Sequence, residues 1–225
     1  MLFLALESST DAGSVALWRD GVVREAFCPA GQPSSATLLP LAATLLAEAG
    51  ATFAELDAIA YAAGPGSFTG LRVACGLAQG LAVAHERPVL GIGTLDVIAA
   101  AVDAPRVAVS LDARMNEVYA GLFEDGEAVS AIGVHAPEAV PLPPGEGWVA
   151  AGNALAAYPA LHARMGGACR SLLPEIAPTA AMLAPLAAPR LQRGEGIDPA
   201  LAAPVYVRDK VVLTVAERVA QGGRA

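Results

Sequence analysis

Two carboxylates are the residues of this sequence best placed to do chemistry. Glu7 ends the first apolar run and precedes a turn with Ser9 and Thr10, and Asp112 ends a similar run in the middle of the chain. Carboxylate oxygens are ligands that Mg²⁺ prefers, and hydroxyl-bearing turns can donate to phosphate. If the two turns face each other across a cleft, these four residues would form a residual nucleotide site.

The composition of the second turn argues against this site. The turn contains Arg114 and Met115, which would crowd a phosphate, and it has neither a glycine nor a hydroxyl. Two ordinary turns closed by polar residues are therefore the alternative to a working nucleotide site.

A further candidate is the loop Gly64-Pro-Gly-Ser-Phe-Thr-Gly70, which opens a predicted helix. The amino end of a helix binds anions through its free N–H groups and its dipole. The loop lacks a lysine and the dinucleotide-binding spacing. A tight strand-to-helix connection, capped by Ser67 or Thr69, is the favoured interpretation of the loop.

Other reactive residue types are too dispersed for the common enzyme classes. The three histidines, at 85, 135 and 162, are isolated, which leaves zinc or iron without ligands. The single lysine, Lys210, lies outside any glycine-rich loop, which disfavours a Walker-type site and Schiff-base chemistry. We therefore expect no catalytic residue and no metal site.

The elements that carry the two carboxylates are duplicated. Leu17-Trp-Arg-Asp-Gly21 matches Leu122-Phe-Glu-Asp-Gly126 at an offset of 105 residues (122 − 17), and Glu7 and Asp112 share that offset. Asp-Gly between β-type runs is a strong hairpin signal. Each copy therefore predicts a three-stranded antiparallel meander, with the third strand of the second copy over 127–133.

Helices and further strands follow each meander. We expect strands over 58–63, 89–93 and 148–151, and helices over 34–48, 71–85, 94–102 and 153–165. Alternating strands and helices imply parallel pairing, so each unit is a mixed sheet covered by helices. Prolines from 174 to 204 interrupt the second copy, which we expect to be trimmed. The predicted division is a first subdomain over 1–104, a second, degenerate subdomain over 105–204, and a tail over 205–225.

Two of the predicted helices suit an interface with a partner. Alanines repeat every four residues along 71–85, so another helix could approach closely there, and the leucine-rich helix 34–48 is apolar nearly all round. The alternative is that both faces belong to the chain's own core. The predicted interface residues are Leu38, Leu41, Leu45, Ala74, Leu77, Ala78, Leu81 and Ala82.

Composition and charge narrow the class of protein. Of the 225 residues 55% are hydrophobic and 16% charged, which supports a packed core, and the net charge of −8 without a basic stripe argues against direct nucleic-acid binding. No apolar run has the length of a membrane helix, the amino end lacks a basic signal-peptide region, and the three cysteines are far apart. We expect a cytoplasmic protein with no membrane association.

Several motifs together resemble one family. The sequence is similar to the TsaB (YeaZ) family of bacterial accessory proteins in tRNA threonylcarbamoyladenosine synthesis, and the matches span nearly the whole chain. They are Leu4-Ala-Leu-Glu-Ser-Ser-Thr10, Gly64-Pro-Gly-Ser-Phe-Thr-Gly-Leu-Arg72, Gly80-Leu-Ala82, Asp112-Ala-Arg-Met-Asn-Glu-Val-Tyr119, Gly152-Asn153 and Pro204-Val-Tyr-Val-Arg208.

The resemblance implies a fold and a set of partners. The fold would be a duplicated ribonuclease H-like α/β fold of the actin/Hsp70 (ASKHA) type. The partners would be a TsaD-like catalytic subunit, which transfers threonylcarbamoyl to the adenosine beside the anticodon, and a TsaE-like ATPase. The two helices flanking the Gly64–Gly70 loop would form the heterodimer interface, and the isolated chain would form a homodimer there. Two departures are Glu7, where the family usually has aspartate, and 32–34, where it commonly has a histidine.

The function expected on this basis is that of a non-catalytic scaffold and activator. The isolated chain would be inactive, would contact tRNA only indirectly, and would hold no cofactor, with ATP or ADP and Mg²⁺ possible only within the complex. The alternative is a nucleotide-binding ATPase or kinase of the same fold. A peptidase is a third hypothesis, which the missing catalytic groups disfavour.

Overall fold

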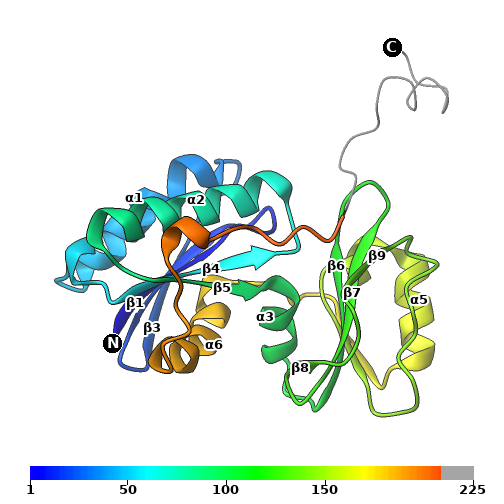
Figure 1. The fold of residues 1–225 in the computed structure, drawn as a ribbon. Coiled ribbons are helices and arrows are strands. Elements are labelled where there is room, and N and C mark those ends of the chain that lie inside the picture. Colours follow the sequence, from blue (N-terminus) through cyan, green and yellow to red (C-terminus); the bar gives the residue numbers. More distant parts are fainter. Residues whose placement is uncertain (209–225) are drawn as a thin grey trace, which may run out of the picture.

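Two Asp-Gly turns belong to the two hairpins from which the fold is built. In the computed structural model, which describes residues 1–208, φ is 48° and 93° at Asp20-Gly21 and 49° and 83° at Asp125-Gly126. Positive φ at both central residues matches the twist of the flanking strands. Each turn belongs to one lobe, and the two lobes lie side by side (Figure 1).

The first lobe contains a five-stranded sheet with the order β3-β2-β1-β4-β5. The strands β1 to β3 form an antiparallel meander, and β4 and β5 continue the sheet in parallel with β1. Both β1 and β4 are buried along their whole length, as expected for central strands covered on both faces. The strands are β1 (Leu2–Glu7), β2 (Ser14–Arg19), β3 (Val22–Phe27), β4 (Ala58–Gly64) and β5 (Val89–Gly93).

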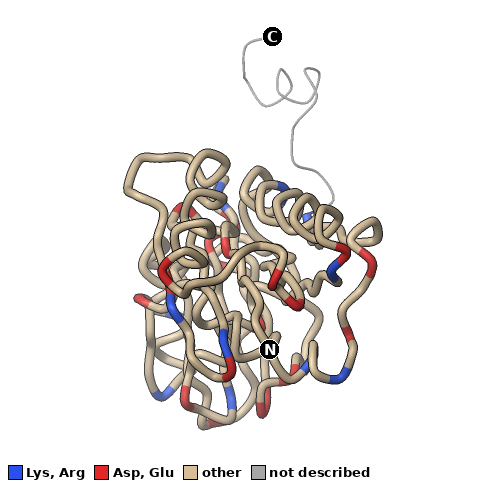
Figure 2. Tube along the Cα trace, turned by 90° about the vertical axis from the view of Figure 1, so that its left-hand side faces the viewer, with Lys and Arg blue, Asp and Glu red and all other residues tan. Residues whose placement is uncertain are grey.

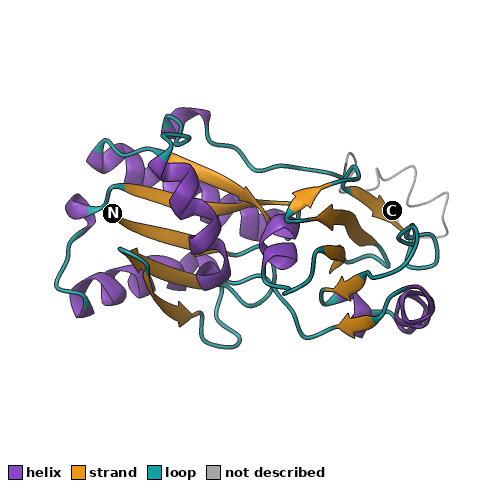
Figure 3. Ribbon diagram, turned by 90° about the horizontal axis from the view of Figure 1, so that it is seen from below, coloured by secondary structure: helices purple, strands orange, loops and turns teal. Residues whose placement is uncertain are grey.

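The second lobe repeats this topology. Its sheet has the order β11-β10-β6-β7-β8, so that β6, β7 and β10 take the places of β1, β2 and β4. Pairing is again antiparallel for β6 with β7 and parallel for β6 with β10. The predicted duplication is confirmed (Figure 3). The strands are β6 (Arg106–Asp112), β7 (Val118–Glu124), β8 (Glu127–Ala128), β9 (Gly133–His135), β10 (Val149–Ala151) and β11 (Ser171–Leu173).

The third strand of the second meander differs from the prediction of 127–133. It breaks into β8 and β9, which both pair with β7. Between them the hydroxyl of Ser130 accepts the N–H of Leu122 at 2.9 Å. A side chain thus takes the place of a backbone partner for the Leu122 N–H, while the N–H of Val129 still donates to the Leu122 carbonyl at 2.8 Å.

Helices cover both faces of the first sheet. The helices α1 and α2 pack on one face, and α6 packs on the other (Figure 1). The amino end of α2 lies three residues before the predicted position because the hydroxyl of Ser67 accepts the N–H of Gly70 at 3.3 Å. The helices of this lobe are α1 (Ser34–Glu48), η1 (Phe53–Glu55), α2 (Phe68–His85), α6 (Ala180–Gln192) and η2 (Pro199–Leu201).

One helix from each half of the chain packs against the other lobe. The prolines at 185 and 189 lie inside α6, yet this helix is capped by Thr179 and buries an alanine-rich face on the first sheet. This burial outweighs the two missing backbone donors. In return α3 (Thr94–Ala100) contributes Leu95, Ile98 and Ala99 to the core of the second lobe. The tail predicted over 205–225 lies outside the described residues beyond Arg208.

The outer face of the second sheet has a thinner cover. The single helix predicted over 153–165 is instead α4 (Ala154–Ala157) and α5 (Pro159–Ala168), divided where Tyr158 precedes Pro159. The segment 136–148 covers the rest of this face without a helix. Among the described residues, no helix combines the length and apolarity that crossing a bilayer requires.

Candidate functional site

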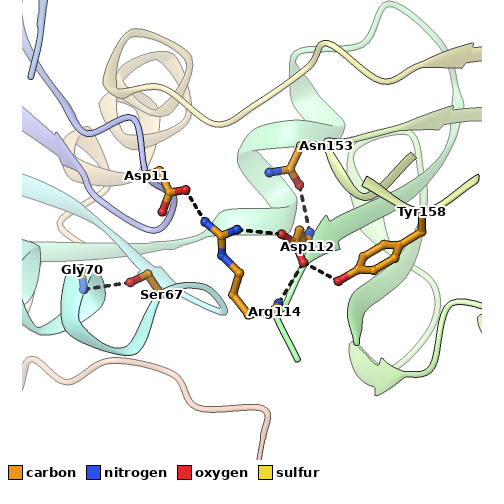
Figure 4. A network of polar contacts seen from close by, with 7 residues as sticks. All are labelled: Asp11, Ser67, Gly70, Asp112, Arg114, Asn153 and Tyr158. Atoms are coloured by element: carbon orange, nitrogen blue, oxygen red, sulfur yellow. Dashed lines mark hydrogen bonds and ion pairs between the residues drawn. The ribbon is translucent and has the colours of Figure 1, made fainter. Parts of the chain in front are cut away.

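A cleft of about 410 Å³ lies between the two lobes. Its walls are the β1–β2 turn, the amino end of α2, the β6–β7 turn and the segment after η2 (Figure 4). We call it the interlobe cleft. Of the four predicted nucleotide-site residues, Ser9, Thr10 and Asp112 line it, and Glu7 does not.

Glu7 lies beneath the cleft, in the core of the first lobe. Its side chain is fully buried, and its Oε1 accepts hydrogen bonds from the N–H of Ser9, at 2.6 Å, and from the Ser9 hydroxyl. Burial raises its pKa from 4.5 to about 7. The prediction that Glu7 faces a ligand across the cleft is therefore corrected. Its side chain points to the α6 side of the sheet because it shares that face with Phe3 and Ala5.

Asp112, in contrast, lies at the cleft with its carboxylate already engaged (Figure 4). Its Oδ1 accepts from the Tyr158 hydroxyl and from the N–H of Arg114, both at 2.8 Å, and its own N–H donates to Asn153 Oδ1 at 2.9 Å. Burial, followed by this hydrogen bond, raises the pKa of Tyr158 to about 12. Sequence reasoning missed Tyr158, because no spacing in the sequence relates it to Asp112.

Arg114 connects the two lobes. Its guanidinium forms an ion pair with Asp11 on the first lobe and lies 3.4 Å from Asp112 Oδ2 on the second. These contacts place a positive charge in the cleft, as the sequence predicted, whereas Met115 points outward and is 65% exposed. A cation bound here would compete with Arg114 for both carboxylates, so these residues fit a Mg²⁺–nucleotide poorly in this arrangement.

The β6–β7 turn adopts a rare backbone conformation. Three successive non-glycine residues, Arg114, Met115 and Asn116, have φ of 61°, 55° and 58°. Left-handed residues of this kind cost roughly 1–2 kcal/mol each and persist only where the surroundings hold them. The N–H of Ala113 donates to the carbonyl of Glu117 at 2.9 Å and closes the turn.

Residues 203–208 cross the mouth of the cleft as a strap. The N–H of Val205 donates to the carbonyl of Ala63 at 2.7 Å, and Arg72 Nε donates to the Tyr206 hydroxyl at 2.9 Å, which fixes the strap to the first lobe. Arg208 donates to the carbonyl of Ala113 at 2.9 Å and so reaches the second lobe. The strap gave no sequence signal apart from its similarity to the family motif.

The second predicted site is the surface formed by α1 and α2, which we call the α1–α2 face. Ala74, Ala78 and Ala82 are buried against the chain's own sheet, and this corrects the prediction that their stripe faces a partner. Of the predicted leucines, two are buried in the same core, Leu38 and Leu45, and three are half-buried at its edge, Leu41, Leu77 and Leu81.

A different stripe of small residues faces outward. Gly76 and Gly80, one helical turn apart on α2, are exposed, and a Cβ built at either would meet no atom within 4 Å. Glycine in a helix interior costs about 1 kcal/mol relative to alanine. The described chain therefore carries two destabilising glycines on this face for which its own packing gives no reason.

The α1–α2 face is also poor in charge. Of the residue types Asp, Glu, Lys and Arg, its two helices contain only Glu48 and Arg72, whereas such residues of both signs occur along the rest of the trace (Figure 2). The apolar side chains it exposes include Leu39, at 46%, and Val83, at 64%. A charge-poor surface with exposed apolar side chains is typical of a protein–protein contact.

No metal centre accompanies these surfaces in residues 1–208. No three side chains of histidine, cysteine, aspartate or glutamate come together there in a way that could hold a metal ion. The two candidate sites described above are the interlobe cleft and the α1–α2 face.

Two lobes of identical strand order, with a cleft between them and a reduced second lobe, define the class of protein. It is the duplicated ribonuclease H-like α/β fold of the actin/Hsp70 type, and the predicted fold class is confirmed. Two solved structures from Pseudomonas aeruginosa share it at 37% sequence identity. One, described as an uncharacterized protein with similarity to peptidase YEAZ, has a TM-score of 0.83 over 92% of this chain and 99% of its own. The other, described as YeaZ, has a TM-score of 0.81 over 91% and 99%.

Sequence comparison identifies the family. The chain is 35% identical to the tRNA threonylcarbamoyladenosine biosynthesis protein TsaB of Escherichia coli, over 94% of this chain and 96% of that protein. It is 42% identical to the Haemophilus influenzae protein of the same name, over 53% and 52%. The profile of the family described as TsaD, tRNA N6-adenosine threonylcarbamoyltransferase, matches residues 28–137. The chain belongs to the TsaB (YeaZ) family, which takes part in tRNA threonylcarbamoyladenosine biosynthesis.

Proposed function

We propose that this protein is a non-catalytic scaffold that pairs with a TsaD-type transferase through the α1–α2 face. The observation that carries the proposal is the pair of exposed glycines on α2. Because nothing in the described chain packs on Gly76 or Gly80, their cost is best explained by a helix that approaches closely from outside. The E. coli relative is named a tRNA threonylcarbamoyladenosine biosynthesis protein, and this name supports a role for the present chain in the same pathway as the transferase.

The fold itself favours a partner of similar architecture. The TsaD profile matches residues 28–137, a segment that includes both α1 and α2. A relative of the same fold would present an equivalent pair of helices, and two such pairs can pack face to face. The same geometry would allow two copies of this chain to pair when the transferase is absent. We therefore propose a homodimer of the isolated chain, which the heterodimer replaces.

The interlobe cleft supports a non-catalytic role. Among the described residues, two acidic side chains line it: Asp11 pairs with Arg114, and Asp112 accepts from the Tyr158 hydroxyl and lies beside Arg114. We infer that ATP or ADP with Mg²⁺ binds only in the assembled complex, with a TsaE-like ATPase supplying hydrolysis. The net charge of −8 means that tRNA would be contacted through the transferase rather than through this chain.

The rival proposal is a nucleotide-dependent ATPase or kinase of the same fold. The interlobe cleft, with a volume of about 410 Å³, is large enough to hold a nucleotide. Reconstitution separates the two. Threonylcarbamoyladenosine formation on tRNA is measured, with an activated threonylcarbamoyl donor and ATP supplied throughout, for this chain alone, for the transferase and ATPase alone, and for all three. The scaffold proposal expects product only with all three, and no ATP turnover by this chain alone. ATP turnover by the isolated chain that disappears in Asp112→Ala would favour the enzyme.

A further inference from the structure

The strap makes a third connection between the two lobes. The chain first passes from the first lobe to the second between β5 and α3, and it returns between β11 and α6. The strap then crosses again, from the side of α2 to the β6–β7 turn, and is drawn in orange in Figure 1. Two connections define an axis about which two bodies can rotate, and a third connection away from that axis prevents the rotation.

The first two connections lie on one face of the first sheet and the strap lies on the other. The helix α6 packs on one face, and α3 contributes Val97 to the same cluster. The strap lies on the face of α1 and α2, where the Tyr61 hydroxyl donates to the carbonyl of Ala203 at 3.3 Å. The strap is therefore placed to stop a hinge rotation about the other two connections.

The strap reaches the second lobe mainly through the guanidinium of Arg208. Its Nη2 donates to the carbonyl of Ala113 at 2.9 Å and forms an ion pair with Glu117, and its Nη1 lies 3.7 Å from the sulfur of Met115. These three residues alternate along the β6–β7 turn, so the turn curves around the guanidinium. The side chain of Arg208 is only 13% exposed, and Val207 beside it packs against the core of the second lobe.

The conformation of this turn needs support from outside the turn. Residues 114–116 are all left-handed, whereas none of residues 8–13, in the equivalent turn of the first lobe, has a positive φ. The duplicated fold therefore does not itself require the left-handed conformation. Such residues persist only where the surroundings hold them, and Arg208 binds the residues on both sides of the three, Ala113 and Glu117.

The turn also determines how the cleft is closed. Arg114 belongs to the turn, and its guanidinium pairs with Asp11 on the first lobe and lies 3.4 Å from Asp112 Oδ2 on the second. A turn that relaxed to right-handed conformations would aim the Arg114 side chain elsewhere. Release of the strap would therefore remove the third connection and also disturb the ion pair that crosses the cleft.

We propose that the strap is a latch that holds the interlobe cleft closed, with Arg208 as its positioning residue. When the guanidinium is seated in the β6–β7 turn, it fixes the left-handed conformation and links that turn to α2. When it is released, the two remaining chain crossings act as a hinge and the lobes rotate about them. The closed cleft is thus a state that residues 203–208 maintain.

The test compares Arg208→Ala with Arg193→Ala in the full chain. Arg193 is the matched control, because it forms its ion pair with Glu195 inside the first lobe. Residual dipolar couplings measured by NMR report the orientation of one lobe relative to the other. The couplings of both wild-type lobes should fit the described arrangement with a single alignment tensor, and so should those of Arg193→Ala. In Arg208→Ala the two lobes should require different tensors.

Hydrogen exchange tests the hold on the turn. The amides of Ala113 and Glu117, which close the turn, should exchange roughly tenfold to a hundredfold faster in Arg208→Ala, because a charged hydrogen-bonding group is lost. Amides of β1 and β4 should keep their wild-type rates. Arg208→Lys should restore part of the protection, since an ammonium can still pair with Glu117. Glu117→Gln, which removes the ion pair from the other side, should change both measurements in the same direction and serves if Arg208→Ala does not fold.

Three results would overturn the latch. The first is a folded Arg208→Ala whose lobes keep the wild-type orientation under one tensor. The second is wild-type exchange of the turn amides in that variant. The third is a wild-type protein whose lobes already require two tensors, because the strap would then not hold them together.

Discussion

The replacement of Glu7 by glutamine tests whether this carboxyl is a buried, neutral group rather than a ligand site. Glu7 is fully buried, and its Oε2 has no hydrogen-bond partner among the described residues. Burial, with a smaller contribution from Glu25, raises its pKa from 4.5 to about 7. Because a tenfold change in proton affinity corresponds to 1.36 kcal/mol, the charged form destabilises the folded state by about 3 kcal/mol.

The sign of the pH dependence follows from linkage. The folded state binds the proton of Glu7 more tightly than the unfolded state, so this group lowers the free energy of unfolding as pH rises from 4.5 to about 7. Above that range the loss is constant. Glutamine stays neutral at every pH and can still accept the N–H of Ser9. The stability difference between Glu7→Gln and wild type should therefore grow in favour of glutamine by roughly 2.5 kcal/mol between pH 5 and pH 8.

Urea denaturation at pH 5, 6, 7 and 8 measures this difference. Taking the variant relative to wild type at each pH removes the contributions of other titrating groups. Glu138→Gln, at an exposed carboxylate, controls for the loss of one negative charge. If the curves of Glu7→Gln and wild type run parallel across this range, the carboxyl is charged and solvated in the folded protein, and the assignment of Glu7 to the core is wrong.

Three further predictions concern the two candidate sites. Ala78→Arg should unfold the isolated chain or lower its thermal midpoint steeply, because Ala78 is fully buried against its own sheet. A wild-type thermal midpoint for this variant would show that Ala78 lies at the surface. Gly76→Ala should stabilise the monomer by about 1 kcal/mol in chemical denaturation at a protein concentration too low for two copies to pair, since the helix gains propensity and the added Cβ meets nothing in the described chain; a loss of stability under these conditions would reveal a contact within the chain. The Asp11–Arg114 ion pair is largely exposed, so a double-mutant cycle of Asp11→Asn and Arg114→Met should give a coupling free energy of unfolding below about 1 kcal/mol. A larger coupling would show that this ion pair contributes substantially to holding the two lobes together.

The strands were predictable because their signals are local. Apolar runs bounded by Asp20-Gly21 and Asp125-Gly126 define the hairpins by chemistry that no distant residue changes. The common offset of Glu7 and Asp112 then implied the duplicated sheet. The helix α6 was not predictable in the same way, because its prolines at 185 and 189 oppose a helix locally and only burial on the first sheet compensates for them.

The orientation of a helix was harder to predict than its existence. The helix α2 carries an alanine stripe and a glycine stripe, and both are compatible with a close helix contact. The structure places Ala74 and Ala78 inward because methyl groups gain by burial, whereas Gly76 and Gly80 have no side chain to bury. Glu7 was misplaced for a related reason. Its face of the sheet is covered by α6, which the sequence did not predict.

The central claim is that a transferase of the TsaD family binds the α1–α2 face. The most direct test is the affinity of this chain for that partner, measured by analytical ultracentrifugation or calorimetry for wild type, Gly76→Arg and Gly167→Arg. Gly167 is the matched control, because it is also an exposed helical glycine with no atom within 4 Å of an added Cβ, but it lies on α5 of the second lobe.

An arginine at 76 would bury a long side chain and an unpaired charge if a partner helix lies above it. Burying such a charge costs several kcal/mol, and each 1.4 kcal/mol changes affinity tenfold. We predict that Gly76→Arg melts at or above the wild-type temperature but binds the transferase on the order of a hundredfold more weakly, while Gly167→Arg binds with wild-type affinity. Wild-type affinity for a normally folded Gly76→Arg would contradict the account and place the interface on another surface.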